Sequence, residues 1–392
     1  MTSNGKIDRR ALPAPTAFRT VLDADFVAHQ DELEHQLVQI WENLLGVQPI
    51  GIRDNFFDLG GHSLLAVRLI AQIQQQFGKS PPLAILFQNP TIEQLAVVLR
   101  QPDDATSWSP LVTIHGRGSK CPLFCVPGAG GNVLCFERLA RYMGPNQPVY
   151  GLQALGLDGK SEPYARIKDM AACYIDAIQT VQPQGPYLLS GHSFGGQVAF
   201  EMAQQLLRQG HRVALLAILD NHAPMVIDQS AAEDWDNAGW LSALAEIIGQ
   251  SFGVDLEISH EALRALGLDD QFDYLLKQMQ RTQILPPDAG IDQIRGFVRV
   301  FQANHRVKLI NYAAEDIWPV RIALFRSHDL FPEDTDNNAF AEILRDPTLG
   351  WSRFGTDVDV HLVSGDHISM MVELNVRELA TKLSDCLEEA EA

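Results

Sequence analysis

The chain has 392 residues, and its 49 Asp and Glu against 30 Lys and Arg give a formal net charge of −19. The length suggests two or three domains, and 46% hydrophobic with 20% charged residues is typical of a globular rather than a disordered protein. The acidic balance argues against non-specific binding to nucleic acid or anionic membranes, and no apolar run is long enough to span a bilayer. We therefore expect neither a nucleic-acid nor a membrane partner.

The cysteines and the N-terminal residues indicate a cytoplasmic protein. Residues 1–6 lack the apolar core of a secretory signal. The cysteines are odd in number, scattered and without a CxxC pair, so we expect reduced thiols and no metal site. They are Cys121, Cys125, Cys135, Cys173 and Cys386.

Residues 1–27 are predicted to be an extended segment and linker, and residues 28–101 a small all-α bundle. Apolar residues recur at helical spacing over 33–44, 65–77 and 92–99, which predicts three helices. Gly46 and Gly78 are placed to end the first two helices, and Thr91 to cap the third. The core of such a bundle is too thin for a deep active-site pocket.

Ser63 lies at the predicted start of the second helix, after two glycines. A serine there can simply cap the helix, contributing about 1 kcal/mol, although the helix-start amides also favour a phosphate on its hydroxyl. The segment Asp58-Leu59-Gly60-Gly61-His62-Ser63-Leu64 resembles the attachment motif of peptidyl carrier domains in nonribosomal peptide synthetases. The resemblance implies that Ser63 carries 4′-phosphopantetheine, added from coenzyme A by a phosphopantetheinyl transferase.

Residues 1–12 are similar to the last segment of an adenylation domain, where the family places a catalytic lysine at Lys6. We expect these residues to be an excised edge of that domain, with Lys6 inert. Residues 102–110 have the composition of a linker. From residue 111 to 392, short apolar runs alternate with longer amphipathic segments, which predicts a mostly parallel sheet covered by helices.

The segment Gly191-His192-Ser193-Phe194-Gly195 follows a short apolar run and precedes an amphipathic helix. In this strand–turn–helix context a G-x-S-x-G string indicates the nucleophile elbow of an α/β-hydrolase, with Ser193 as the nucleophile. The chain order serine, acid, histidine limits the base to histidines after Ser193. His361 lies inside the expected final strand, 358–363, whereas His367 follows it in a loop, where the fold presents its base.

Two aspartates fit the position of the acid. Asp220 ends the buried run 213–219, and Asp329 follows the expected strand 321–326. Residues 111–392 resemble the thioesterase domains of peptide synthetases, which implies that the acid comes from the earlier strand and is Asp220. We interpret Asp366 as a solvated or turn-forming carboxylate.

An oxyanion hole requires two backbone amides near the nucleophile. One is expected from the residue after it, Phe194, and the other from the loop after an early strand. Residues 123–126 are predicted to form that strand and 127–132 its loop. The resemblance assigns the second amide to Ala129, although Val126-Pro127 stands where the family often has His-Pro.

The roughly 100 residues between Asp220 and the next strand are more than a crossover needs, so we expect a helical lid at about 225–316. Together these features predict the terminal module of a nonribosomal peptide synthetase. A carrier domain would deliver a peptidyl thioester, and a thioesterase would release the peptide through a peptidyl-O-serine intermediate by hydrolysis or macrocyclisation. The implied partners are upstream adenylation and condensation domains of the same synthetase, and we expect a monomer. Two alternatives are a free-standing esterase or lipase with a helical interaction module, and a proofreading thioesterase.

Overall fold

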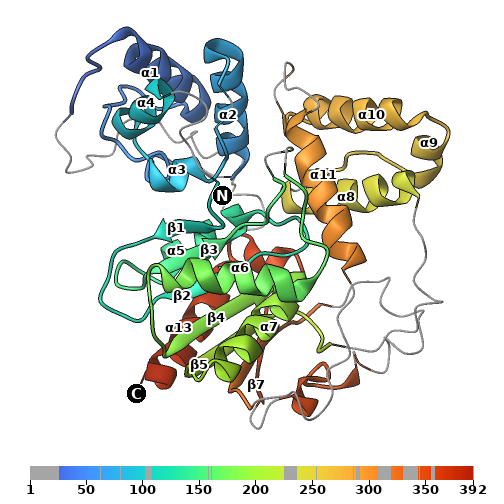
Figure 1. The fold of residues 1–392 in the computed structure, drawn as a ribbon. Coiled ribbons are helices and arrows are strands. Elements are labelled where there is room, and N and C mark those ends of the chain that lie inside the picture. Colours follow the sequence, from blue (N-terminus) through green and yellow to red (C-terminus); the bar gives the residue numbers. More distant parts are fainter. Residues whose placement is uncertain are drawn as a thin grey trace, which may run out of the picture. The chain divides into compact units, whose positions relative to one another are not determined.

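The computed structural model describes two compact units, residues 1–105 and 106–392, each considered by itself (Figure 1). The described residues are 26–61, 63–79, 81–101, 108–157, 159, 161–224, 236–252, 254–285, 287, 292–307, 319–329, 343, 345–354 and 358–391. The predictions for the extended segment before residue 26, including Lys6, and for most of the linker lie outside these residues. No helix in the described ranges is both long enough and apolar enough to span a bilayer.

The first unit is helical, as predicted, and the three expected helices are present. Gly46 ends α1 in the left-handed conformation with φ 67°, and the Thr91 hydroxyl accepts a hydrogen bond from the third residue of α4. The prediction missed one short helix, α3, because four residues are too few to show a helical period. The helices are α1 (Glu32–Leu45), α2 (Ser63–Phe77), α3 (Ile85–Gln88) and α4 (Ile92–Arg100).

The core of the first unit holds the loop that leads into α2. Trp41 of α1 is fully buried and packs edge-on against Phe56, with the ring centroids 5.1 Å apart. The Phe56 carbonyl accepts from the Gly61 N–H at 2.8 Å, and a β-carbon on Gly61 would lie 2.4 Å from the Phe56 ring. Only glycine fits at that position, so the start of α2 is fixed by close packing.

The second unit contains a seven-stranded sheet in the order β1-β3-β2-β4-β5-β6-β7. Only the β1–β3 pair is antiparallel, which confirms the predicted α/β-hydrolase-like, mostly parallel sheet. The strands predicted near 123–126, 213–219, 321–326 and 358–363 form, and the apolar run 187–189 before the elbow is also a strand. The strands are β1 (Leu111–His115), β2 (Leu123–Val126), β3 (Val149–Leu152), β4 (Tyr187–His192), β5 (Val213–Leu219), β6 (Ile322–Ser327) and β7 (Val358–Val363).

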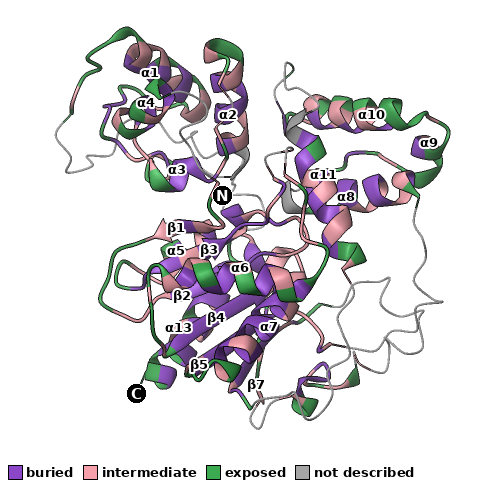
Figure 2. Ribbon diagram, viewed as in Figure 1, coloured by how far each residue is buried: buried purple, intermediate pink, exposed green. Residues whose placement is uncertain are grey.

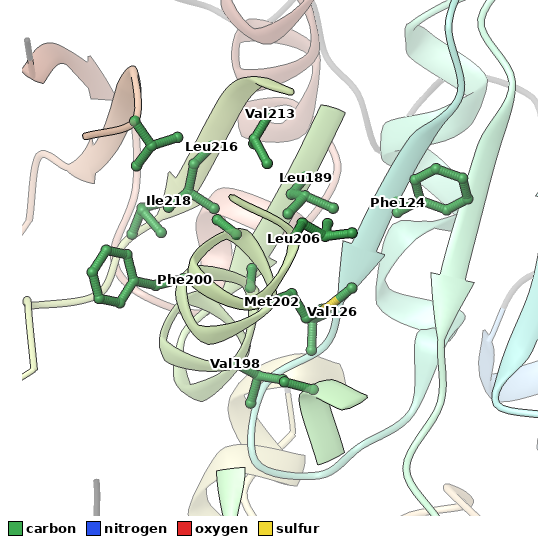
Figure 3. Packing of buried hydrophobic residues seen from close by; sticks show 14 of the residues in the cluster. Phe124, Val126, Leu189, Val198, Phe200, Met202, Leu206, Val213, Leu216 and Ile218 are labelled. Atoms are coloured by element: carbon green, nitrogen blue, oxygen red, sulfur yellow. The ribbon is translucent and has the colours of Figure 1, made fainter. Parts of the chain in front are cut away.

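Helices cover both faces of this sheet. The helices α6 (Ile167–Gln179) and α7 (Phe194–Arg208) pack together on one face, and α5 (Glu137–Tyr142) and α13 (Asn375–Glu391) pack together on the other (Figure 1). The central strands are buried along almost their whole length (Figure 2). Figure 3 shows Val198, Met202 and Leu206 of α7 packed with side chains of β4 and β5. This rigid layer fixes where the strands end, and the candidate site lies at those ends.

Among the described residues, four helices lie between β5 and β6 in sequence, within the region predicted to form a lid. They are α8 (Asn237–Phe252), α9 (His260–Arg264), α10 (Leu268–Arg281) and α11 (Asp292–Arg306). α8 contacts α9, α10 and α11, so these helices form one group (Figure 1). We call this group the lid helices, after the role that the sequence predicts for this region.

Candidate functional site

Ser193 sits on a sharp turn between β4 and α7. Its φ of 53° and ψ of −132° are unfavourable for a residue with a β-carbon. Two glycines make the turn feasible: a β-carbon on Gly191 would lie 2.1 Å from the Gly195 carbonyl, and one on Gly195 would lie 2.2 Å from the Val126 carbonyl. The Ser193 N–H donates to the Leu219 carbonyl at 2.9 Å, which ties the turn to β5. The G-x-S-x-G string is thus a strained elbow.

The structure brings together the three residues that the sequence singled out as nucleophile, base and acid. His367 Nε2 lies 2.9 Å from Ser193 Oγ, and His367 Nδ1 lies 2.8 Å from Asp220 Oδ2. A carboxylate only accepts, so Nδ1 carries the proton and Nε2 is left to accept from the serine hydroxyl. Such a chain of hydrogen bonds can remove the proton of Ser193 during attack on a carbonyl group.

Asp220 is held in place from the neighbouring strand. It adopts φ 51° at the end of β5, and its two carboxylate oxygens accept from the Ser327 N–H at 2.7 Å and the Ser327 hydroxyl at 3.0 Å. Burial alone would raise the pKa of Asp220, but the hydrogen bond and charge of His367, together with the Ser327 bonds, lower it below its usual range. Asp220 is therefore ionised at neutral pH.

Sequence analysis did not select Ser327. Its position in the sequence could have indicated this role, because Ser327 ends a buried strand that neighbours the strand of Asp220. Parallel strands end at the same edge of a sheet, so a polar residue there can reach the acid.

His192 is a second residue that sequence analysis did not select, although it lies inside the elbow motif. Its Nε2–H donates to the His367 carbonyl at 2.9 Å, and the two imidazole rings stack with centroids 5.1 Å apart. Burial, reinforced by the nearby His367, lowers the pKa of His192 to about 4. His192 is therefore neutral at neutral pH and ties the loop of His367 to the elbow.

The rejected candidates have other side-chain partners. Asp329 is exposed, and its carboxylate lies 3.1 Å from His328 Nδ1. Asp366 accepts from the Ile368 and Ser369 N–H groups, as a turn-forming carboxylate does. His361 is on β7, where its Nε2 lies 3.3 Å from the Cys386 sulfur.

The loop after β2, residues 127–131, closes against the elbow; we call it the oxyanion loop, after the role that the sequence predicts for it. A β-carbon on Gly128 would lie 3.3 Å from Ser193 Cβ, so this loop runs beside the nucleophile. Its turn is held by a 2.8 Å hydrogen bond from the Gly131 N–H to the Gly128 carbonyl. Ala129 belongs to this turn, and Phe194 is the first residue of α7, whose N–H has no carbonyl partner within the helix.

In the first unit, Ser63 is the first residue of α2, a 15-residue helix. Gly60, with φ 94°, and Gly61 form the turn before it. The N-terminal end of a helix carries a partial positive charge, which suits a covalently held phosphate. The residues present at this position therefore fit the predicted prosthetic group.

Comparison with known families agrees with this arrangement. Residues 121–387 match the model of the thioesterase domain, and residues 35–99 match that of the phosphopantetheine attachment site. The first match alone covers more than half of the chain. The chain belongs to the thioesterase domain family. The second match indicates a covalently attached phosphopantetheine in this thioesterase-family chain.

The similar proteins include nonribosomal peptide synthetases. Chondramide synthase of Chondromyces crocatus is 35% identical over 98% of this thioesterase-family chain, which spans 10% of that protein. The crystal structure of a holo four-domain nonribosomal peptide synthetase bound to AMP and glycine is 32% identical, with a TM-score of 0.64, over 98% of this chain and 28% of that one. The Vlm2 thioesterase domain, 23% identical with a TM-score of 0.50 over 70% of this chain and 96% of that one, shares the fold.

Proposed function

We propose that this chain is the terminal, product-releasing module of a nonribosomal peptide synthetase, with Ser193, His367 and Asp220 as its catalytic triad. The observation that carries the proposal is the hydrogen-bonded chain Ser193–His367–Asp220, with distances of 2.9 and 2.8 Å, on a strained elbow. The order of these residues along the chain, serine then acid then histidine, is that of an α/β-hydrolase.

The first half of the reaction transfers the acyl group to the serine. His367 Nε2 takes the hydroxyl proton while Ser193 Oγ attacks the thioester carbonyl, and Asp220 stabilises the imidazolium that forms. The amides of Ala129 and Phe194 would hold the negative oxygen, and the loss of one such donor typically costs 10²–10³ in rate. The C–S bond then breaks, and the leaving sulfur receives the proton from His367, which leaves a peptidyl ester on Ser193.

The second half of the reaction releases the peptide. His367 removes a proton from the acceptor, either water or an amine or hydroxyl of the peptide itself, and the acceptor attacks the ester carbonyl. When the C–O bond breaks, His367 returns the proton to Ser193 Oγ. Water gives a linear acid, whereas an internal acceptor gives a ring. We assign the choice between them to the lid helices, because they control access of water to the ester.

We further propose that Ser63 is the attachment point of 4′-phosphopantetheine. The group supplies a thiol on a long flexible arm, which holds the acyl chain as an activated thioester. The chain's own contribution is the helix start at Ser63 and the glycine turn before it. We propose domain boundaries at 1–27 for the adenylation-like segment and linker, 28–101 for the carrier, 102–110 for the linker and 111–392 for the thioesterase, with upstream synthetase domains and a transferase as partners.

The test compares two serine variants of the full chain. Each is incubated with a peptidyl coenzyme A and a broad-specificity transferase, and protein mass and released peptide are followed by mass spectrometry. We expect Ser63→Ala to gain no mass, and Ser193→Ala to load normally but release nothing. Release by Ser193→Ala would refute the assigned nucleophile. A loaded Ser63→Ala would refute the attachment point, and an unloaded wild type would favour an esterase with a helical interaction module.

A further inference from the structure

One lid helix packs directly on the oxyanion loop. Asn304, near the C-terminal end of α11, donates its Nδ2–H to the Ala129 carbonyl at 2.8 Å. A β-carbon on Gly130 would lie 2.7 Å from the Phe297 ring, and one on Gly131 would lie 2.8 Å from Val300 Cγ1. The contact residues of α11 therefore span two turns of the helix, and the missing side chains of the two glycines allow the close approach.

The polar side chain of Asn304 indicates that its hydrogen bond to the loop matters in addition to its packing. The residue is 3% exposed, and its Oδ1 has no hydrogen-bond partner among the described residues. A leucine would fill a similar volume without leaving a buried oxygen unpaired, which costs free energy. The orientation of the amide is set by its partner, because only Nδ2 can donate to a carbonyl. The donated hydrogen bond is what an apolar side chain could not supply.

This hydrogen bond acts on the residue proposed as an oxyanion donor. The Ala129 carbonyl belongs to the peptide group between Ala129 and Gly130, at the centre of the turn closed by the Gly131–Gly128 hydrogen bond. Gly130 restricts rotation of its neighbours least of all residues, so a bond from outside the turn is needed to fix that peptide plane. The Ala129 N–H lies in the preceding peptide group, whose Gly128 carbonyl accepts from the Gly131 N–H. The two hydrogen bonds together hold both peptide planes that flank the Ala129 α-carbon, and so the direction of the Ala129 N–H.

We infer that Asn304 is a positioning residue for the oxyanion hole, through which the lid helix α11 holds the oxyanion loop in its catalytic shape. The inference rests on the proposed function, since it requires Ala129 to bind the oxyanion. A displacement of α11 would break the Asn304 bond and disorganise the hole. Catalysis is thereby made dependent on where this lid helix lies.

The test uses Asn304→Leu and Asn304→Asp in the full chain, with Gln302→Leu as a matched control. Gln302 lies on the same helix, but its Nε2–H donates to Asn237 Oδ1 of α8 at 3.2 Å and not to the loop. Initial rates with a short peptidyl thioester of N-acetylcysteamine give kcat and KM, and circular dichroism verifies folding. We expect both Asn304 variants to lower kcat about 10- to 100-fold with KM changed less than about twofold, because a misplaced donor weakens only transition-state binding. Gln302→Leu should keep both constants within about twofold.

Three kinetic outcomes would overturn the inference: unchanged kcat in the folded Asn304 variants, an equal loss of kcat in Gln302→Leu, or a rise in KM at constant kcat. If both Asn304 variants fail to fold while Gln302→Leu folds, the role of Asn304 is structural and the inference is likewise wrong. Ser193→Ala separates this question from the proposed function. Activity that persists in Ser193→Ala refutes the proposed mechanism, whereas an inactive Ser193→Ala beside fully active Asn304 variants refutes only the positioning role.

Discussion

The neutral imidazole of His192 should make the stability of the thioesterase unit fall as the pH falls. Its pKa is about 4 in the folded protein against an ordinary 6.5, so between these values the unfolded chain binds more protons than the native one. The stabilising contribution is complete above about pH 6.5 and is lost towards pH 4. A difference of about 2.5 pKa units corresponds to about 3 kcal/mol, an upper limit because the side chain is only partly buried and water screens its charge.

The variant His192→Gln isolates this contribution. Its side-chain amide can still donate to the His367 carbonyl but does not titrate between pH 4 and 7.5. Urea unfolding of wild type and variant, followed by circular dichroism at several pH values, gives the difference in unfolding free energy. We expect wild type to lose up to about 3 kcal/mol relative to the variant between about pH 7.5 and 4. Stability curves that stay parallel over this range would refute the reasoning.

Three further predictions concern the supports of the site. Ser327→Ala should lower kcat/KM about 10-fold in steady-state assays, since it removes one hydrogen bond to the Asp220 carboxylate; an unchanged value would contradict this role. Gly131→Ala should lower the free energy of unfolding in urea by more than about 2 kcal/mol, because its β-carbon would lie 2.4 Å from Ala154 Cβ. The control Gly144→Ala, at a position with φ 86° and open space around it, should lower the same quantity by only about 1 kcal/mol. Trp351→Ala should cost about 3–5 kcal/mol by the same measurement, since the indole is fully buried and donates to a backbone carbonyl; a loss below 1 kcal/mol would show that the cavity closes.

Local signals predicted many of the elements of this fold. A helix end at Gly46 needs only a glycine that adopts positive φ, and a buried strand such as β5 needs only a continuous apolar run. The elbow at Ser193 was also readable, because its glycines and its strand–helix context are contiguous in sequence. These features depend on residues within a few positions of one another.

The identity of the catalytic acid could not be predicted from local sequence patterns. Asp220 and Asp329 both follow buried strands, and the residues alone left both open. Our proposal of Asp220 rests on geometry: His367 Nδ1 lies 2.8 Å from Asp220, whereas the Asp329 carboxylate is exposed beside His328. A hydrogen bond between residues 147 positions apart depends on where two strands end, which no local pattern records.

The sequence by itself determined which residues could act as nucleophile, base and prosthetic-group attachment point, since each carries its chemistry within a short motif. Only the tertiary structure decided what holds them. Ser327, His192 and Asn304 belong to no motif that names their partners, and each reaches the site through a hydrogen bond across the fold. The physical reason is that a hydrogen bond requires an approach of about 3 Å, and such approaches are set by the packing of whole strands and helices.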